Sequence, residues 1–587
     1  MRTRSDTGSL KQFFALQQPV TDVSKRELAA TSFFAGALLL LCALTFYYFA
    51  VLKIDYGKTA LLNLGPYPDA TEYFAQARTL LKEGWPSIQI GYDKLPSRYP
   101  FGYPALILPW LNVLPTADAV LAPFRTNQSL GLLLLLAVFG FYAYLAMPLT
   151  GGVAALLLAT LPGFFIFCRS SMSEISASAL VVFAFMFAYL GLKEECRWKI
   201  YVSAAFLGLS LNIRMQSLFF APLLLVMAFF PERRTRLRWL LHCAALLILF
   251  LLAASPGLAL NTIEFHSAFK TGYDFWVPRV PKWSEPLFSL RYVPNNVARL
   301  WSEFALRRSG FSAANIFGTG TCFVPAFVLL TCVGLLFIHK GRFTFCALLS
   351  GLSFLAAALV YSVADIRLYL PLLLLLIAVA ALPVTWAAEN LFTGKRIIVV
   401  LVVFALFSGA CVGYPSRSGY NTSGIDRSQA WDALQFTTPP AESTWFIAQR
   451  RFLEVFGRQP GIVLSDIDPV YLNAFFPDWI VAAPLHWKHR YRFSRNWHYG
   501  PDEALALVNR GLQQSHTVYA LFVSRQEMEE KMVRLPHVDD YEWVLAEDPT
   551  AEAAILKLSP RSKGVDGSAK SVACQISLEN RNGCSQL

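Results

Sequence analysis

Runs of about 20 predominantly apolar residues dominate this chain, and each run is long enough to cross the hydrocarbon core of a bilayer as one helix. The chain has 587 residues, of which 55% are hydrophobic and only 15% are charged. A soluble core does not need apolar runs of this length, so a bilayer must be the solvent for most of them. The clearest runs span 31–51, 128–147, 173–192, 238–260, 319–338 and 366–383, and shorter or polar-interrupted runs span 151–168, 200–212, 217–230, 342–361 and 396–414. The sequence therefore predicts a polytopic α-helical membrane protein with about 11 transmembrane helices.

Clusters of Lys and Arg indicate how these helices are oriented, because basic residues that flank a span are retained on the cytoplasmic side. The clusters comprise Arg2, Arg4, Lys11, Lys25 and Arg26 near the N-terminus and the segments 193–199, 231–238, 339–342 and 394–396. With about 11 spans, all of them fall on one side of the membrane. We therefore expect a multi-pass protein of the cell (inner) membrane with a cytoplasmic N-terminus. The first apolar run lacks a small-residue cleavage site, so we interpret it as a retained span rather than a signal peptide.

The same orientation gives the expected domain organisation. It consists of a cytoplasmic segment 1–28, a transmembrane module 29–414 with a large first extracytoplasmic loop 53–125, an extracytoplasmic α/β domain 415–560 and a disordered tail 561–587. In the α/β domain, predicted strands at 461–466, 518–524 and 554–558 alternate with predicted helices at 467–476 and 525–535. The tail is rich in Ser, Lys, Gly and Asn. Its Cys574 and Cys584 form either a disulfide or two free thiols.

The formal net charge of +12 raises the question of nucleic-acid binding. Much of the basic excess lies in short loops, where membrane topology already explains it. We therefore expect no nucleic-acid partner, and we expect membrane lipids as neighbours of the helices.

Two carboxylates follow the first apolar run, in 65-GPYPDATEYFAQA-77. In the structural interpretation, Asp69 is the N-cap and Glu72 the N3 residue of a helix that ends near Gly84, which makes a capping box. In the chemical interpretation, a carboxylate held rigidly by its own helix at the mouth of a membrane domain acts as a general base. Both interpretations fit the sequence.

The order of these segments resembles the GT-C type membrane glycosyltransferases, which include the protein O-mannosyltransferases, the lipid A aminoarabinose transferases and many bacterial relatives. The resemblance rests on 69-DATEYFAQARTLLKEGW-85, 98-RYPFGYPALILPW-110, 161-LPGFFIFCRSSMSE-174, 208-GLSLNIRMQSLFFAPLL-224, 365-DIRLYLPLLLLL-376 and 462-IVLSDIDPVYLNAF-475. The resemblance extends over most of the chain, although each of these segments is short and degenerate.

The resemblance implies transfer of a sugar from a polyprenyl-phosphate-linked donor on the outer face, with inversion and with Asp69 as the general base. Glu174 stands where family members often have a second acid, and it would position the acceptor or a divalent ion. Glu72 is the third candidate catalytic acid. The sequence lacks the adjacent Asp-Glu pair of the protein mannosyltransferases, which weakens the case for a protein acceptor. A lipid, a glycan and a protein all stay open as acceptors, and a metal requirement stays open as well.

The leaving lipid phosphate carries negative charge that Arg, Lys or a metal must meet. The candidate ligands of the donor phosphate are Arg98, Arg169, Arg214 and Arg367. Each also has a structural interpretation: a rigid Pro-rich loop around Arg98, interfacial placement for Arg169, a surface turn at Arg214, and an ion pair with Asp365 for Arg367.

Two other classes of protein compete with an enzyme. A multi-span transporter would need charges paired inside its spans, broken helices and usually internal repeats; the sequence has one interrupted hairpin around Arg214 and no repeat. A non-catalytic envelope scaffold would use the C-terminal domain to bind partners, and it would not depend on Asp69.

Overall fold

The computed structural model describes most of the membrane module and much of the C-terminal part. The described residues are 22–53, 69–229, 235–275, 288–303, 325–337, 342–362, 366–390, 444–457, 460–465, 472, 476, 478–482, 501–546 and 553–561. The predicted span 396–414, the tail 561–587 beyond its first residue, and Cys574 and Cys584 lie outside them, as does most of the predicted helix 467–476.

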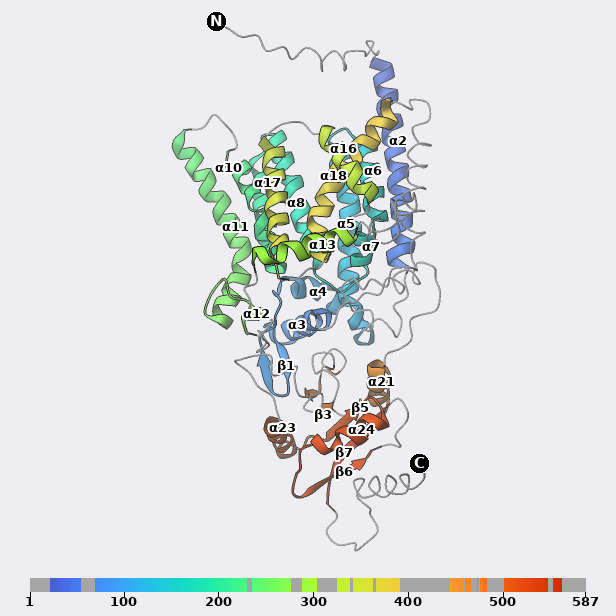
Figure 1. Ribbon diagram of the computed structural model, residues 1–587, viewed down its shortest axis with the longest axis vertical. Coiled ribbons are helices and arrows are strands. Elements are labelled where there is room, and N and C mark those ends of the chain that lie inside the picture. Colours follow the sequence, from blue (N-terminus) through green and yellow to red (C-terminus); the bar gives the residue numbers. More distant parts are fainter. Residues whose placement is uncertain are drawn as a thin grey trace.

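Apolar helices form a bundle in the upper part of Figure 1. They are α2 (Asp22–Tyr47) with the π turn η1 (Tyr48–Leu52), α5 (Ala122–Tyr144), α6 (Pro148–Thr160), α7 (Pro162–Cys168), α8 (Glu174–Lys193), α9 (Arg197–Ile213), η4 (Met215–Phe220), α10 (Pro222–Ala228), α11 (Arg236–Phe265), α16 (Pro325–Gly334), η7 (Leu335–Phe337), α17 (Arg342–Leu359), η8 (Ile366–Tyr369) and α18 (Leu370–Asn390). Among the described residues, five helices are long and apolar enough to cross a membrane. The chain is a helical membrane protein. All the predicted apolar runs except 396–414 overlap helices of the bundle, and the count of about 11 transmembrane helices stays a prediction.

Small residues let the central helices approach one another closely. A Cβ atom at Gly36 of α2 would collide with the backbone of Pro148, and one at Gly152 of α6 would collide with the backbone of Gly36. Helices in a membrane associate through van der Waals packing, and glycine pairs of this kind shorten the distance between their backbones. The interface between α2 and α6 therefore depends on these glycines.

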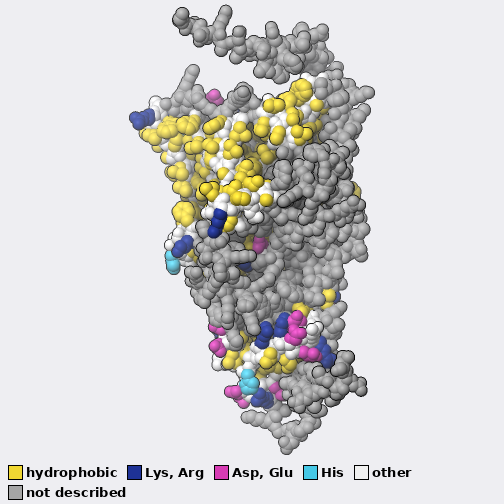
Figure 2. Space-filling model, in the orientation of Figure 1, with side chains coloured by type: hydrophobic (Ala, Val, Ile, Leu, Met, Phe, Trp, Pro, Cys, Tyr) yellow, Lys and Arg dark blue, Asp and Glu magenta, His cyan; other side chains and the backbone are white. Residues whose placement is uncertain are grey.

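The bundle presents apolar side chains to its surroundings. Along α11, Leu240, Leu247 and Ile248 are exposed, although a soluble protein would bury most of such a row. Figure 2 shows apolar side chains spread over the described part of the bundle and charged side chains gathered at the opposite, C-terminal end. This distribution fits a bundle whose outer surface is solvated by lipid.

A short amphipathic helix, α13 (Val293–Glu303), crosses the bundle beside α17 and follows the turn η6 (Leu290–Tyr292) (Figure 1). The amide of Asn296 on α13 donates to Leu359 O at 2.7 Å and to Tyr361 O at 2.8 Å. The side chain of Asn296 therefore satisfies carbonyls that the end of α17 leaves without helical partners.

The first loop packs between the bundle and the C-terminal unit (Figure 1). It contains α3 (Asp69–Glu83), the hairpin strands β1 (Ile88–Ile90) and β2 (Asp93–Leu95), α4 (Gly102–Val113) and the 3-10 turn η3 (Thr116–Leu121). The first half of α3, residues 70–77, is buried all round. Within it Ala70, Tyr73, Phe74 and Ala77 lie at helical spacing and form an apolar cluster with residues of α4 and the bundle. A further short helix, α12 (Gly272–Phe275), approaches this loop from the end of α11.

The C-terminal unit is a five-stranded sheet with the strand order β4-β3-β5-β7-β6. Its elements are α21 (Thr444–Phe456), β3 (Ile462–Ser465), β4 (Ile480–Ala482), α23 (Pro501–Gln513), β5 (Val518–Phe522), α24 (Arg525–Lys531), η10 (Met532–Arg534), β6 (Tyr541–Leu545) and β7 (Ala554–Pro560). Strands β4, β3 and β5 run parallel, β7 pairs antiparallel with β5, and the edge strand β6 pairs antiparallel with β7. The predicted strands 461–466, 518–524 and 554–558 coincide with β3, β5 and β7, and the predicted helix 525–535 contains α24.

Candidate active site

Asp69 begins α3, at the end of this helix that lies near the bundle. Acidic residues in a first turn are stabilised by the positive end of the helix dipole, which explains why Asp69 and Glu72 suit this position. The carboxylate of Asp69 accepts a hydrogen bond from the hydroxyl of Tyr99, which lies in the loop that follows β2. Tyr99 thus restricts the orientation of the acid.

Glu72 binds the same loop instead of its own helix terminus. Its Oε1 accepts from Nε of Arg98 at 2.7 Å and pairs with the Nη2 group, and its Oε2 accepts from Ser97 Oγ at 3.1 Å and from Arg98 N at 3.3 Å. The capping-box interpretation is therefore wrong for Glu72, because a nearby guanidinium offers a charge-assisted partner that a backbone N–H does not match. Burial lowers the pKa of Arg98, but Glu72, Tyr99 and Asp69 together raise it above its ordinary value.

Tyr73 connects α3 to the head of α8. Its hydroxyl shares a hydrogen bond of 2.9 Å with Ser173 Oγ, and its ring packs 4.8 Å from that of Tyr99 and 5.0 Å from that of Tyr103. Burial raises the pKa of Tyr73 above its ordinary value, and nearby Arg214 opposes this rise. The charges of Glu174 and Asp69 add to the rise. Tyr73 consequently stays neutral at physiological pH and lies within electrostatic reach of both acids.

Glu174, the first residue of α8, is completely buried. Its Oε1 lies 3.1 Å from Nη2 of Arg214, whose side chain is only 14% exposed. Arg214 lies between the end of α9 and η4 in an extended conformation, so the turn aims it at the head of α8. A buried carboxylate needs such a partner, since an uncompensated charge would be costly in this environment.

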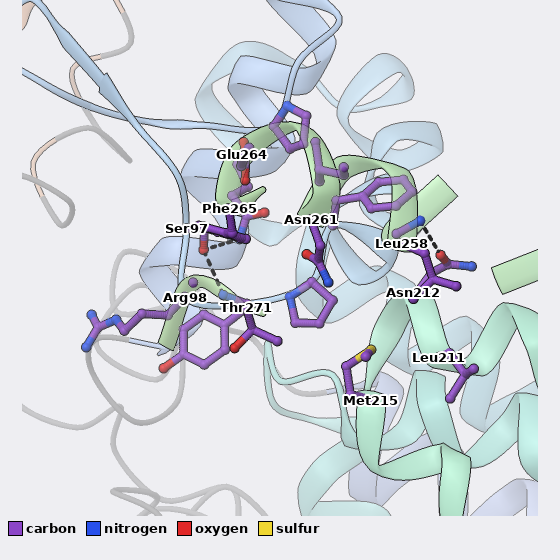
Figure 3. A pocket seen from close by; sticks show the side chains of 18 of the residues that line it. Ser97, Arg98, Leu211, Asn212, Met215, Leu258, Asn261, Glu264, Phe265 and Thr271 are labelled. Carbon is purple, nitrogen blue, oxygen red and sulfur yellow. Dashed lines mark hydrogen bonds between the residues drawn. The ribbon is translucent and has the colours of Figure 1, made fainter. Parts of the chain in front are cut away.

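A small cavity lies on the other side of the loop that carries Arg98 (Figure 3). It is bordered by Ser97 and Thr271, by the end of α9 at Asn212, and by Asn261 and Glu264 of α11. In this view the guanidinium of Arg98 points away from these residues. A second cavity of about 280 Å³ is lined by Arg78 and Lys82 of α3, by the end of α4, and by Asp478 just before β4. Lys82 Nζ lies 3.7 Å from Asp478 Oδ1.

Neither a model of a known protein family nor a curated protein matches the sequence. Solved structures do match the fold. ArnT from Cupriavidus metallidurans in the apo state aligns with a TM-score of 0.56 and 11% identity, over 89% of this chain and 97% of that chain. The same protein bound to undecaprenyl phosphate aligns with a TM-score of 0.55 and 11% identity over the same shares of the two chains.

This chain has a GT-C type glycosyltransferase fold. The oligosaccharyltransferase of Archaeoglobus fulgidus in the apo form also aligns, with a TM-score of 0.48 and 12% identity, over 87% of this chain and 73% of that chain.

Within the GT-C fold, the structure brings Asp69, Glu174 and Arg214 around Tyr73, while Glu72 and Arg98 form a separate pair one turn further along α3. Arg169 follows α7, close in sequence to this site, and is half-buried. Arg367 lies in η8 before α18, and its predicted partner Asp365 is outside the described residues. The roles of all four arginines in phosphate binding stay predictions.

The residues that contact Asp69 and the start of α8 were not predicted from the sequence. Tyr99 and Tyr73 bridge segments far apart in the chain, and no spacing rule pairs them with Asp69 or Ser173. Asn127 of α5 was also missed: its amide donates to Ser170 O at 2.8 Å and to Met172 O at 2.6 Å, which fixes the approach to α8. Its signal is an amide inside an otherwise apolar span, which needs buried partners.

In the part of the chain that the structure describes, no group of three or more His, Cys, Asp or Glu side chains is placed to hold a metal ion.

Proposed function

We propose that this protein transfers a sugar from a polyprenyl-phosphate-linked donor to a cell-envelope acceptor at the extracytoplasmic face of the inner membrane. The configuration at the sugar C1 inverts, and Asp69 is the general base. The GT-C fold supports this proposal, as does the undecaprenyl phosphate bound to ArnT from Cupriavidus metallidurans. The acceptor is a lipid, a glycan or a protein.

One observation carries the proposal. The acid at the start of α3 and the acid–arginine pair at the start of α8 meet around a buried tyrosine, although more than 100 residues separate Asp69 from Glu174 in the chain. Structural ion pairs alone do not require two helix heads to converge in this way. Buried, charged side chains that converge at the mouth of a bundle are typical of a reaction centre.

The chemistry needs a base and a site for negative charge. An acceptor hydroxyl or amine attacks the sugar C1 while Asp69 takes its proton, and the bond between C1 and the phosphate oxygen breaks. The electron pair of that bond leaves with the polyprenyl phosphate, so no general acid is needed. Tyr99, through its hydrogen bond, holds the Asp69 carboxylate in one orientation for this step.

The leaving phosphate requires cationic partners. Arg214 is one candidate, since it and Asp69 both act electrostatically on Tyr73, and its pairing with Glu174 keeps the guanidinium fixed before the donor arrives. Arg169 and Arg367 are the further candidates for this role. Arg98 is already neutralised by Glu72, so its contribution is to hold the loop of Tyr99 beside Asp69.

The test compares cells that lack the protein with their parent. Lipid extracts and envelope fractions are analysed by mass spectrometry. We expect a sugar-modified envelope component to disappear and a polyprenyl-phosphate-linked sugar to accumulate, because the donor is no longer consumed. An unchanged envelope in both fractions would contradict the proposal and favour the transporter or the scaffold.

A further inference from the structure

The β1–β2 hairpin of the first loop reaches from the candidate active site to the C-terminal unit. Its two-residue turn consists of Gly91 and Tyr92, and Gly91 adopts a φ of 61°, a conformation that favours glycine. Gly91 N donates to Val481 O of β4 at 2.8 Å. Since β4 is an edge strand of the C-terminal sheet, the hairpin tip occupies part of an edge that would otherwise be open.

The side chain of Tyr92 contacts the C-terminal unit in two ways. Its hydroxyl donates to Gln514 Oε1 at 2.7 Å, and the guanidinium of Arg510 lies 3.9 Å from the centre of its ring. Both partners come from α23 and the turn that follows it. A hydrogen bond and a close cation–π contact on one side chain fix the hairpin tip relative to the C-terminal unit.

The other end of the hairpin holds the two acids of α3. After β2, the chain passes through Ser97 and Arg98, which bind Glu72, to Tyr99, which binds Asp69. Only seven positions separate Tyr92 from Tyr99. The base of the hairpin packs Ile88 and Leu95 against Ala75 of α3, so close packing holds the hairpin against the helix.

A third segment, α12, packs against the same loop. Gly272 of α12 lies so close to the backbone of Ser97 that a Cβ atom there would collide with it. The loop is thus confined by α3 and by α12; along the chain it continues on one side into α4 and on the other through the hairpin, whose tip contacts the C-terminal unit.

We propose that the C-terminal unit sets the position of the Tyr99 loop, and with it Asp69, through the β1–β2 hairpin, with Tyr92 and Arg510 as positioning residues for sugar transfer. This inference rests on the proposed role of Asp69. It makes the C-terminal unit a part of the catalytic assembly, not only a binding module appended to it.

The experiment uses the full-length protein in detergent or nanodiscs and two readouts. The first is hydrogen exchange at the amides of Arg98 and Tyr99, which donate to Glu72 and to Ser97 Oγ. The second is the rate of transfer with a lipid extract of cells lacking the protein as the donor source. The rate at saturating extract is separated from the amount of extract that gives half the maximal rate.

Tyr92→Ala and Arg510→Ala are the test variants. We expect Tyr92→Ala to speed exchange at the two amides about tenfold and to lower the saturating rate about tenfold, because a small displacement of a positioned group costs this much or more. The half-saturating amount of extract should not change. Tyr92→Phe keeps the ring under the guanidinium and should retain most of the rate, and Arg510→Lys should recover part of what Arg510→Ala loses.

Lys94→Ala is the matched control. Lys94 lies on the same hairpin but pairs with Glu83 of α3 at 2.8 Å, away from the C-terminal unit. The Lys94→Ala variant should therefore leave both readouts at wild-type values. Unchanged exchange and rate in Tyr92→Ala would overturn the inference. Asp69→Asn, measured in parallel, separates the two proposals: if it stays fully active, the proposed base is wrong, and the exchange readout alone decides whether the hairpin positions the loop.

Discussion

The carboxylate of Glu72 holds Arg98 by both its side chain and its backbone, with 2.7 Å to Nε and 3.3 Å to the backbone N. Glu72 is only 2% exposed, whereas the Arg98 side chain is 30% exposed. Three residues earlier on the same helix, Asp69 binds the hydroxyl of Tyr99. Two acids that look alike in the sequence thus have different tasks: Glu72 fixes the loop, and Asp69 faces the centre where the chemistry is proposed.

Glu72→Gln tests the first of these tasks. It removes the charge that compensates Arg98 and should lower the free energy of unfolding by about 3 kcal/mol. This is the lower end of the cost of breaking a buried ion pair, because Arg98 is partly exposed. Turnover should fall less than in Asp69→Asn. Thermal unfolding in detergent measures the first effect. Glu83→Gln is the control, since it breaks the more exposed pair with Lys94 and should cost at most about 1 kcal/mol. Equal losses in both variants would contradict the assignment.

The Glu174–Arg214 pair predicts non-additive effects. Either Glu174→Gln or Arg214→Met leaves one buried charge without this compensation and should cost about 3 to 5 kcal/mol of stability. The double variant should be more stable than the sum of the two losses predicts, yet it should not bind the polyprenyl phosphate that leaves in the reaction. A double-mutant cycle from thermal unfolding, with binding of undecaprenyl phosphate followed by native mass spectrometry, checks both statements. Additive losses would show that the two side chains act independently.

Tyr73→Phe separates a structural from a functional hydroxyl. The variant loses the 2.9 Å hydrogen bond to Ser173 and should cost about 1 kcal/mol of stability together with a several-fold loss of turnover. Tyr142→Phe is the matched control, because that buried hydroxyl donates to Ala378 O at 3.0 Å within the bundle. It should cost similar stability without the loss of turnover. If both variants lose turnover alike, the Tyr73 hydroxyl has no special part in the site.

Helix packing predicts opposite outcomes at two glycines. Gly36→Leu inserts a side chain where α2 touches the backbone of Pro148, and it should prevent folding or sharply reduce the yield of folded protein. Gly140→Ala places its Cβ on the exposed side of α5 with no atom within 4 Å, so the variant should fold as well as wild type. Size-exclusion profiles of the purified variants distinguish them. A well-folded Gly36→Leu variant would contradict the packing described for α2 and α6.

The sequence predicted the membrane class, the positions of most helices and several strands of the C-terminal sheet. Bilayer thickness and alternating strand and helix patterns are local properties, so they can be found without knowledge of the fold. Strands β4 and β6 were missed because Ile480–Ala482 is only three residues long and because Tyr541–Leu545 mixes polar and apolar residues on an edge.

The candidate site was predictable only in its parts. Asp69 became a candidate because it starts a predicted helix just after the first apolar run, and Glu174 became one because the family resemblance implies a second acid at that place. The pairing of Glu72 with Arg98, in place of the terminus of its own helix, could not be foreseen. This pair forms only because the β1–β2 hairpin brings the loop of Arg98 back to α3. Likewise, Arg214 looked like a surface turn, and only the packing of α9 beside α8 directs it toward Glu174.

The most direct test of the central claim is complementation of cells lacking the protein with wild type or Asp69→Asn, at equal amounts of folded protein in the membrane. Mass spectrometry then measures the sugar-modified envelope component and the polyprenyl-phosphate-linked sugar. We predict that wild type restores the component, whereas Asp69→Asn leaves it absent and the donor accumulated, as in cells with no protein. Full restoration by Asp69→Asn would contradict the account and leave Asp69 as no more than the first residue of α3.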